Sequence, residues 1–451
     1  MRVFHKIHQK LNWSNRHYFL VFCLIIFISY VGSAIYQSYK RLPEGLNYTG
    51  KLRHAQVEFI ANDANQATML KLINEAQRSI VLDLATLNQE VAQPAQPILD
   101  ALIRKKRIDP LLEVTVITDP SNSAYGGVDV ELYRQLRLVG IDVIETNLLP
   151  LRASNPLWSG FWYLCCQGLG NNTQKGWLEN PLGHGQVTLR SYLNWLNLKA
   201  NHRQALVVDT PTGWQTLIGG INLKAKQNQA ALLVTGNTAV DLLNTQRTVA
   251  QFSQGNLSTL IVGEFEAQQN LPQVQVLTEQ AIYHAILNLV ETAKPKDHLD
   301  VTAFYLSERH VIEALKQAQQ RGVTVRILLE KNQLPNQPVA NELTQSGIQL
   351  RWCAQQQAQC STNMILKYNQ AQAELILGSA HFTARSLKNY NLETDVRVIG
   401  QAQAPVFQDA KTYFAQLWLA PHSVDYAKYA QQSIWQTGLY RWKEWSGWSD
   451  F

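Results

Sequence analysis

Residues 201–209 read NHRQALVVD, and residues 214–223, after a short turn that contains proline and glycine, read WQTLIGGINL. The apolar run between His202 and Asp209 predicts a buried strand that begins beside a histidine and ends at an aspartate. The second stretch predicts another strand, which runs into a Gly-Gly-x-Asn corner. Because alternate side chains of a strand share a face, His202 and Gln204 are expected to point the same way.

The rest of the first half alternates helices with apolar strands. The periodicity predicts helices at 65–78, 97–108 and 129–140 and strands at 79–87, 112–119 and 141–145. Strands that alternate with helices favour a mostly parallel sheet that is covered on both faces. The sequence therefore predicts an α/β fold.

The second half repeats this order of elements. The pattern predicts helices at 281–293, 308–320 and 339–347 and strands at 300–306, 323–330 and 348–353. EVTVITD at 113–119 resembles VTVRILLE at 323–330, and each half then ends in paired strands, a further short strand and a closing helix. A period this long indicates a duplicated domain and not a solenoid.

Motif, order and repeat together, over about residues 55–420, resemble the phospholipase D superfamily, whose H-x-K-x-x-x-x-D motif precedes a G-[GS]-x-N corner. His202 and Asp209 keep the spacing of that motif, but Gln204 stands in place of its lysine. The corner is supplied by Gly219, Gly220 and Asn222. The resemblance implies two similar halves with mixed or parallel sheets, packed about a pseudo-twofold axis with one motif from each half at the seam.

In this family one histidine attacks phosphorus, a second protonates the leaving alcohol, and the lysines place positive charge near the phosphate oxygens. The resemblance therefore makes His202 the nucleophile and gives Asp209 the role of holding or tuning a histidine. Gln204 donates hydrogen bonds without a charge, and Gly220 and Asn222 are expected at the substrate. The family needs no metal or cofactor, and no His/Cys cluster here has zinc-ligand spacing.

The second motif is expected in residues 361–369, which read STNMILKYN. Two registers are open. In one, Ser361 and Asn363 replace the histidine and the lysine, and in the other Thr362 and Met364 do. Both registers lack the histidine and the lysine of the family.

The second corner is altered as well, because His381 follows Gly378-Ser379-Ala380 at the position of the family's asparagine. Asn391-Leu392-Glu393 is similar to the Asn-x-Glu that follows second motifs in relatives. We expect Ser379, His381 and Glu393 at the substrate with the replaced residues of the motif. His381 is either a substitute for the missing acid or a corner histidine without a catalytic role. A general acid contributes about 10²–10⁴ in rate, so the altered motifs predict impaired activity.

A membrane anchor is predicted near the N-terminus. Residues 18–36, YFLVFCLIIFISYVGSAIY, carry no charge and can cross a bilayer as a helix, and no small-residue cleavage site follows them. Residues 1–53 hold eight Lys/Arg and one acid, so the remainder of this +6 chain sums to −1. A slightly acidic remainder disfavours nucleic acid as a partner. The basic flank favours a cytoplasmic N-terminus at the inner membrane, with the main domain in the periplasm.

The expected division is a basic flank at 1–16, the anchor at 17–39, a linker at 40–54, the halves at 55–263 and 270–420, and an aromatic tail at 421–451. The aromatic residues of 149–182 and those of the tail each either meet the membrane or pack on the domain. Cys353 and Cys360 are either disulfide-bonded or two small residues near the core.

The sequence thus predicts a membrane-anchored protein similar to bacterial phospholipase D and cardiolipin-synthase-like proteins. It would hydrolyse phospholipid phosphodiesters or transfer phosphatidyl groups. The alternative is a catalytically inactive relative that binds lipid or a partner at the membrane, whereas a nuclease-like relative is disfavoured by the anchor and the charge.

Overall fold

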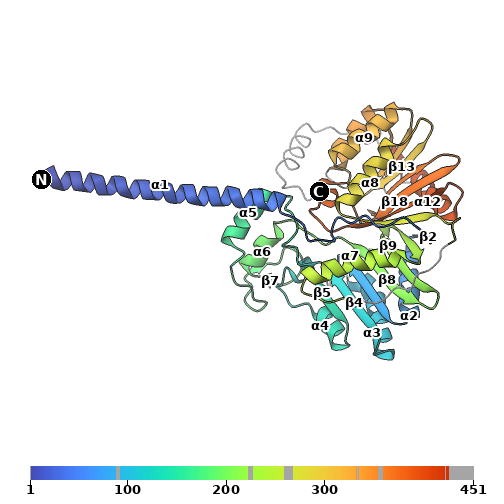
Figure 1. Cartoon of the computed structure of the whole chain (residues 1–451), viewed down its shortest axis with the longest axis horizontal. Helices are drawn as coiled ribbons and strands as arrows, with labels where there is room; N and C mark the ends of the chain where they lie inside the picture. The colour runs from blue at the N-terminus through green and yellow to red at the C-terminus, as the bar shows by residue number, and fades with distance from the viewer. Residues whose placement is uncertain are drawn as a thin grey trace.

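The structure is a computed structural model that describes residues 2–87, 92–221, 227–257, 268–331, 333, 335–353, 359–421 and 423–425. A long N-terminal helix, α1 (Arg2–Tyr39), projects from a body built on two sheets (Figure 1). Its stretch Arg16–Tyr39 is long and apolar enough to cross a membrane.

The first sheet contains the opening motif at its centre. Its order is β2 (Gln56–Ala61), β11 (Ala230–Thr235), β9 (Gly213–Gly219), β8 (Gln204–Thr210), β3 (Ser79–Leu84), β4 (Glu113–Thr118) and β5 (Asp142–Glu145). β3, β4 and β5 are parallel, and the other neighbours pair antiparallel.

The second sheet has the same order with an extra strand at each edge. It runs β1 (Arg53–His54), β12 (Gln273–Thr278), β19 (Thr394–Gln401), β18 (Gln372–Gly378), β17 (Asn363–Tyr368), β13 (His298–Ala303), β14 (Thr324–Leu329), β15 (Gln349–Trp352) and β20 (Val424–Asp425). β1 lies inside the predicted linker, so this part of the linker is an edge strand of the second half.

The fold is mixed α/β, which confirms the mixed sheets that the resemblance implied, although the sheets are not mostly parallel as the alternation of helices and strands alone suggested. Only the βα crossovers produce parallel neighbours, whereas the hairpins β8–β9 and β17–β18 return antiparallel and bring β11 and β19 in antiparallel beside them. The alternation of helices and strands in the sequence does not indicate whether the hairpin strands run parallel or antiparallel to their neighbours.

The sheets face each other across a shared core, with helices outside and at the ends. α2 (Asp63–Glu75), α3 (Ala92–Ile108) and α4 (Glu131–Leu138) cover the outer face of the first sheet, and α8 (Gln280–Glu291), α9 (Arg309–Gln320) and α10 (Asn336–Gln345) that of the second. α7 (Thr238–Phe252) and α12 (Pro405–Leu419) join inward residues of both sheets, such as Val207 and Leu366, in one core.

Two further helices lie on the side of the body from which α1 emerges. α5 (Pro156–Cys165) packs along α1, and α6 (Leu189–Trp195) follows it (Figure 1). The short pair β6 (Leu178–Glu179) and β7 (Gln186–Val187) lies between them in sequence. The aromatic stretch at 149–182 is thus partly a helix that contacts the predicted anchor.

The two halves are joined by backbone hydrogen bonds at their seam. The His202 amide donates to the Leu392 carbonyl at 2.9 Å, and the Leu392 amide donates to the Ala200 carbonyl at 3.0 Å. β10 (Gln227–Asn228) pairs with β16 (Gln359–Cys360), and Cys360 forms a disulfide with Cys353. Apart from Val424 and Asp425, most of the aromatic tail lies outside the described residues.

Candidate active site

His202 lies at this seam, and the second half holds its ring. Nδ1 is 3.1 Å from Oε2 of the fully buried Glu393 and 3.2 Å from the Ser379 carbonyl oxygen. Because a carboxylate and a carbonyl only accept, Nδ1 carries the proton. In the neutral ring the lone pair is then on Nε2, which is the form that a nucleophile needs.

Glu393 is itself held by a chain of hydrogen bonds. The Thr394 amide donates to the Ser379 hydroxyl at 3.1 Å, and that hydroxyl donates to Glu393 Oε2 at 2.6 Å. Its other oxygen, Oε1, has no hydrogen-bond partner among the described residues. Glu393 therefore has the environment of a carboxylate that serves the histidine.

The pKa of His202 is raised above its usual value. Burial alone would lower this pKa, but the Glu393 carboxylate, the Ser379 carbonyl and the charge of Asp119 together outweigh burial. The ring of His202 therefore loses its proton at a higher pH than an ordinary histidine does.

Other buried acids surround the seam. Burial raises the pKa of Asp83 to about 7, and it raises the pKa of Asp119 and, by more, that of Asp395. Each of these acids is therefore deprotonated only at a higher pH than an exposed aspartate.

The first prediction concerns the acid limb of the pH–rate profile. If neutral His202 is the nucleophile, the rate rises with pH through its raised pKa. Glu393→Gln removes the negative charge that raises this pKa, so the acid limb should shift to lower pH while the maximal rate falls. The pH dependence of kcat for both proteins measures this. The matched variant Glu374→Gln, at a partly buried pair with Lys367 and Arg397, should leave the acid limb in place. An identical shift in both variants would contradict the assignment.

His381, from the corner of the second half, lies beside His202. The two ring centroids are 4.9 Å apart. His381 Nδ1 is 3.2 Å from Asn363 Oδ1, which also accepts from the Phe304 amide at 3.1 Å. Since that oxygen only accepts, His381 Nδ1 is a donor. The rings of Phe304 and Tyr305 pack against His381.

Strand pairing favours one register of the second motif. Asn363 begins β17 and pairs with Gly378, and Gln204 begins β8, whose partner strand β9 ends at Gly219. This correspondence favours the register with Ser361 and Asn363 over the register with Thr362 and Met364. The Ser361 hydroxyl donates to the Asn228 carbonyl at 3.4 Å, so it contacts the first half.

The expectation that Asp209 holds the histidine was wrong. Its Oδ1 accepts from the Arg78 and Ser79 amides at 2.8 Å, and its Oδ2 accepts from Arg78 Nε at 2.8 Å. Seven residues of extended strand place Asp209 about 23 Å from His202. Glu393 makes the contact that was assigned to Asp209, while Asp209 ties the far end of β8 to the start of β3.

The first corner has a packing role that requires glycine. Gly219 has φ +114°, and a Cβ there would lie 2.5 Å from Leu377 of the other half. A Cβ on Gly220 would lie 2.7 Å from the side chain of Gln229. Gln204 is buried at the start of β8, and Asn222 lies outside the described residues. Gly219 thus allows the two halves to approach closely, and Gly220 makes room for Gln229 of its own half.

Sequence reasoning missed a buried ion pair next to the histidine. Arg203 Nη2 donates to Glu279 Oε1 at 2.7 Å, and the side chains are 0% and 1% exposed. Glu279 also accepts from the Glu393 amide at 3.3 Å and from the Asn47 amide at 2.9 Å, and its φ is +49°. Strained residues of this kind concentrate at functional sites. No motif or periodicity in the sequence marks Glu279.

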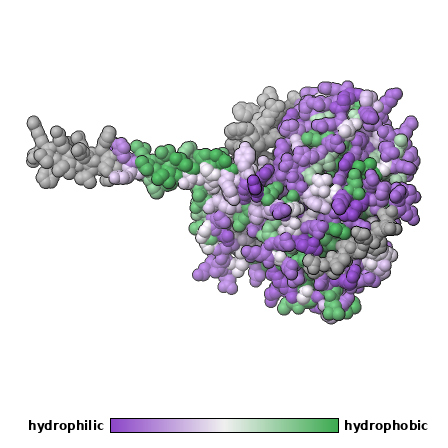
Figure 2. Space-filling view, in the orientation of Figure 1, coloured by the Kyte–Doolittle hydropathy of each residue, from purple (hydrophilic) through white to green (hydrophobic). Residues whose placement is uncertain are grey.

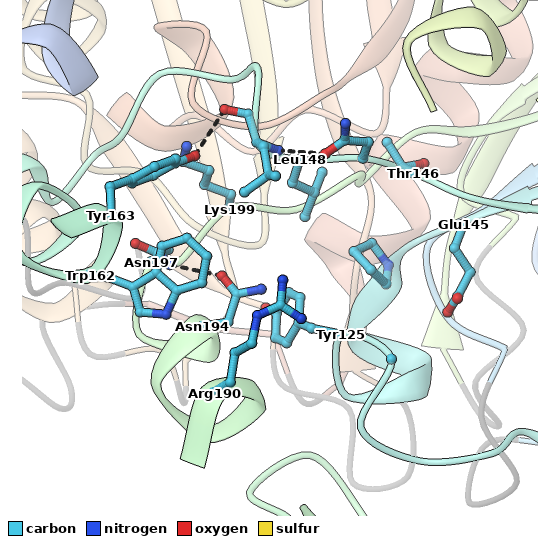
Figure 3. A pocket seen from close by; sticks show the side chains of 14 residues that line it. Tyr125, Glu145, Thr146, Leu148, Trp162, Tyr163, Arg190, Asn194, Asn197 and Lys199 are labelled. Carbon is cyan, nitrogen blue, oxygen red and sulfur yellow. Dashed lines mark hydrogen bonds between the residues drawn. The ribbon is translucent and has the colours of Figure 1, made fainter. Parts of the chain in front are cut away.

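A polar cavity of about 260 Å³ lies between α5, α6 and the ends of β4 and β5 (Figure 3). Lys199 and Arg190 line it, and so does Trp162, whose indole Nε1 has no partner among the described residues. Burial, with the neighbouring Lys40, holds the pKa of Lys199 well below its usual value. In the described ranges no group of three His, Cys, Asp or Glu could hold a metal ion.

Residues 286–418 match the family model described as cardiolipin synthase, PLD-like domain. Among solved structures, the chain is similar to phosphatidylserine synthase from Haemophilus influenzae Rd KW20, with TM-score 0.56 and 11% identity over 89% of this chain and 95% of that one. It is also similar to Nuc, a phospholipase D family member from Salmonella typhimurium, with TM-score 0.28 and 24% identity over 34% of this chain and 97% of that one. No curated protein sequence matches the chain. The family match and the shared fold confirm the predicted resemblance to the phospholipase D superfamily.

Proposed function

We propose that this chain, which has the phospholipase D-like fold and matches the PLD-like domain model at 286–418, is a membrane-anchored protein that acts on phospholipid phosphodiesters. It would hydrolyse the phosphodiester or transfer the phosphatidyl group to an alcohol. The observation that supports this most strongly is the pair of histidine rings at 4.9 Å, one from each half, with Glu393 behind the first.

The proposed reaction uses the protons on the ring nitrogens of His202 and His381. The Nε2 lone pair of His202 attacks phosphorus, and the bond from phosphorus to the leaving alcohol breaks. His381, protonated at both ring nitrogens, gives its Nε2 proton to the leaving oxygen. His381 then takes a proton from water or an acceptor alcohol, whose oxygen attacks phosphorus, and the P–N bond breaks to return the lone pair to His202.

The site lacks the two lysine charges that would stabilise the negatively charged phosphate of a substrate. Gln204 and Asn363 stand at the two lysine positions, and amides offer hydrogen bonds without positive charge. A charge 4 Å from a phosphate oxygen contributes about 4 kcal/mol at the effective dielectric of a protein surface. We infer that protonated His381 provides the positive charge for binding in the reactive form, and that turnover is slower than with both lysines present.

The role of His381 predicts a dependence on the leaving group. His381→Ala should lower kcat/KM about 10²- to 10⁴-fold for a phospholipid with an alkyl alcohol headgroup, because the alkoxide must leave unprotonated. The loss should be much smaller for phosphatidyl-p-nitrophenol, whose leaving group needs no proton. kcat/KM covers only the steps up to headgroup release, so comparing it for both substrates in both proteins tests this, and an equal loss for the two substrates would rule out His381 as the acid.

Trapping of the covalent intermediate tests the proposed function directly. Purified protein in detergent is mixed with a labelled phospholipid, quenched without acid, and digested for mass spectrometry of the peptide that contains His202. An adduct on His202 supports the nucleophilic step. Bound lipid without any adduct would instead favour the inactive, lipid-binding relative, which the replaced lysines make the second candidate.

The anchor and the disulfides support the proposed location. Arg16–Tyr39 can cross a membrane, and Cys353–Cys360 and Cys165–Cys166 are disulfide-bonded, as fits an oxidising compartment. We propose that the body lies on the periplasmic side of an inner membrane, with α1 as its anchor.

A further inference from the structure

α5 follows α1 along its length and does not merely cross it. The Ala153 amide donates to the Gln37 carbonyl at 3.0 Å, and farther along α1 the Ser33 hydroxyl donates to the Gly160 carbonyl at 3.0 Å. A Cβ on Gly160 would lie 2.7 Å from the Ala34 backbone nitrogen, so this glycine permits the close contact. α5 therefore descends from the body beside the last part of α1.

An apolar groove of about 710 Å³ separates the two helices beyond that contact. It is lined by side chains of α1 and α5, among them Ile26, Phe27, Phe161 and Leu164. The groove segment of α1 ends at Tyr30 and begins at Cys23, about 14 to 24 Å from the end of α1 at a rise of 1.5 Å per residue. If α1 spans the bilayer, this depth lies within the hydrocarbon core, which is about 30 Å thick.

The amino-acid composition of α5 is suited to the hydrocarbon core of a bilayer. Its sequence PLWSGFWYLC has no charged residue. Leu157, Phe161 and Leu164 are 56%, 47% and 54% exposed, which a helix on an aqueous surface would rarely show. Figure 2 shows the hydrophobic surface of α1 continuing onto the adjoining edge of the body.

Basic and aromatic side chains mark the end of this apolar zone. Lys40 and Lys199 are buried, 5.2 and 5.5 Å from the centre of the Tyr163 ring, and Arg152 Nε donates to the Lys40 carbonyl. The partly exposed Arg152 lies where α1 enters the body, which is the level of the headgroup phosphates when α1 spans. Cationic and aromatic side chains are the usual residues at that boundary.

We propose that α5 is inserted into the bilayer beside the C-terminal half of α1, and that the groove between them takes one acyl chain of a phospholipid. This inference rests on the membrane anchoring in the proposed function. The opposite face of α5 lines the polar cavity with Trp162 and Tyr163, so the helix separates lipid from the polar side of the body (Figure 3).

Acyl-chain photocrosslinking of the full chain tests the inference. The protein is reconstituted in phosphatidylcholine liposomes that contain a phosphatidylcholine with a diazirine on one acyl chain, irradiated, and digested for mass spectrometry. Adducts are expected on both the apolar part of α1 and Leu157–Cys165. Adducts on α1 with none on α5 would overturn the inference and leave the anchor intact. No adduct on either helix would instead show that the proposed anchoring itself fails.

A pair of variants isolates the groove. Phe161→Glu should reduce adducts on α5 several-fold while adducts near Phe22, on an exposed part of α1, stay unchanged. Ile108→Glu makes the same change at an 81% exposed residue on α3 and should leave all adducts unchanged. Both positions are surface-exposed, so thermal unfolding in detergent should match the wild type. Undiminished α5 adducts in Phe161→Glu would overturn the groove as an acyl site.

Discussion

His202→Ala should abolish turnover of phospholipid phosphodiesters and remove the trapped adduct. Loss of a catalytic nucleophile costs about 10⁴- to 10⁶-fold in kcat, because its reaction path disappears and only binding and positioning remain. The half-buried ring of His202 is held by Glu393 and borders His381, and the reaction needs its Nε2 lone pair. Release of labelled headgroup or transfer product from a labelled phospholipid measures the effect.

The control for this variant is His310→Ala. His310 is 69% exposed on α9, so its loss should leave turnover unchanged. Lipid binding by His202→Ala, measured by flotation with liposomes, should be retained because the anchor is intact. Turnover that survives His202→Ala would show that the chemistry uses another residue, and the two-histidine mechanism would then be abandoned.

Glu279→Ala should destabilise the fold by about 3–5 kcal/mol, because it leaves Arg203 as an unpaired charge in the core. Both side chains are buried, and Nε and Nη1 of Arg203 have no other partner in the described part of the chain. For a chain of 451 residues, the loss corresponds to a melting temperature lower by roughly 3–5 °C. Differential scanning calorimetry in detergent measures it.

Glu131→Ala is the matched comparison. Glu131 pairs with Arg134 three residues along the exposed face of α4, and such surface pairs contribute little to stability. We expect no measurable change in its melting temperature. Because Glu279 also accepts from the Glu393 amide, Glu279→Ala should in addition lower activity at temperatures where the protein is still folded. Similar melting temperatures for the two variants would contradict a structural role for the buried pair.

Much of the fold could be predicted from hydrophobic periodicity. The expected helix at 308–320 is α9 (Arg309–Gln320), and the expected strand at 112–119 contains β4 (Glu113–Thr118). What the pattern did not reveal is the pairing of strands, since strand direction depends on hairpins and not on apolar spacing. The mixed sheets and the edge strand β1 are tertiary features of that kind.

The site was predicted in part, and the reason differs between residues. His202 and Glu393, both chosen from motifs, do meet across the seam. The role given to Asp209 came from the same motif, but that residue lies at the far end of its strand. His381 was left between two alternatives because only the fold shows its ring beside His202. Arg203 and Glu279 carry no local signal, as their partnership spans the two halves.

The unequal contributions of the two halves give the site a polarity. The first half supplies a histidine just before a strand, and the second supplies a carboxylate behind it and a histidine on a corner. With matching motifs on both sides, a diester could be cleaved in either orientation. In the proposed mechanism the leaving oxygen faces the corner of the second half, so a substrate bound in the opposite orientation would not react. The two possible cleavage products of a diester with two different alcohols should therefore form in very unequal amounts.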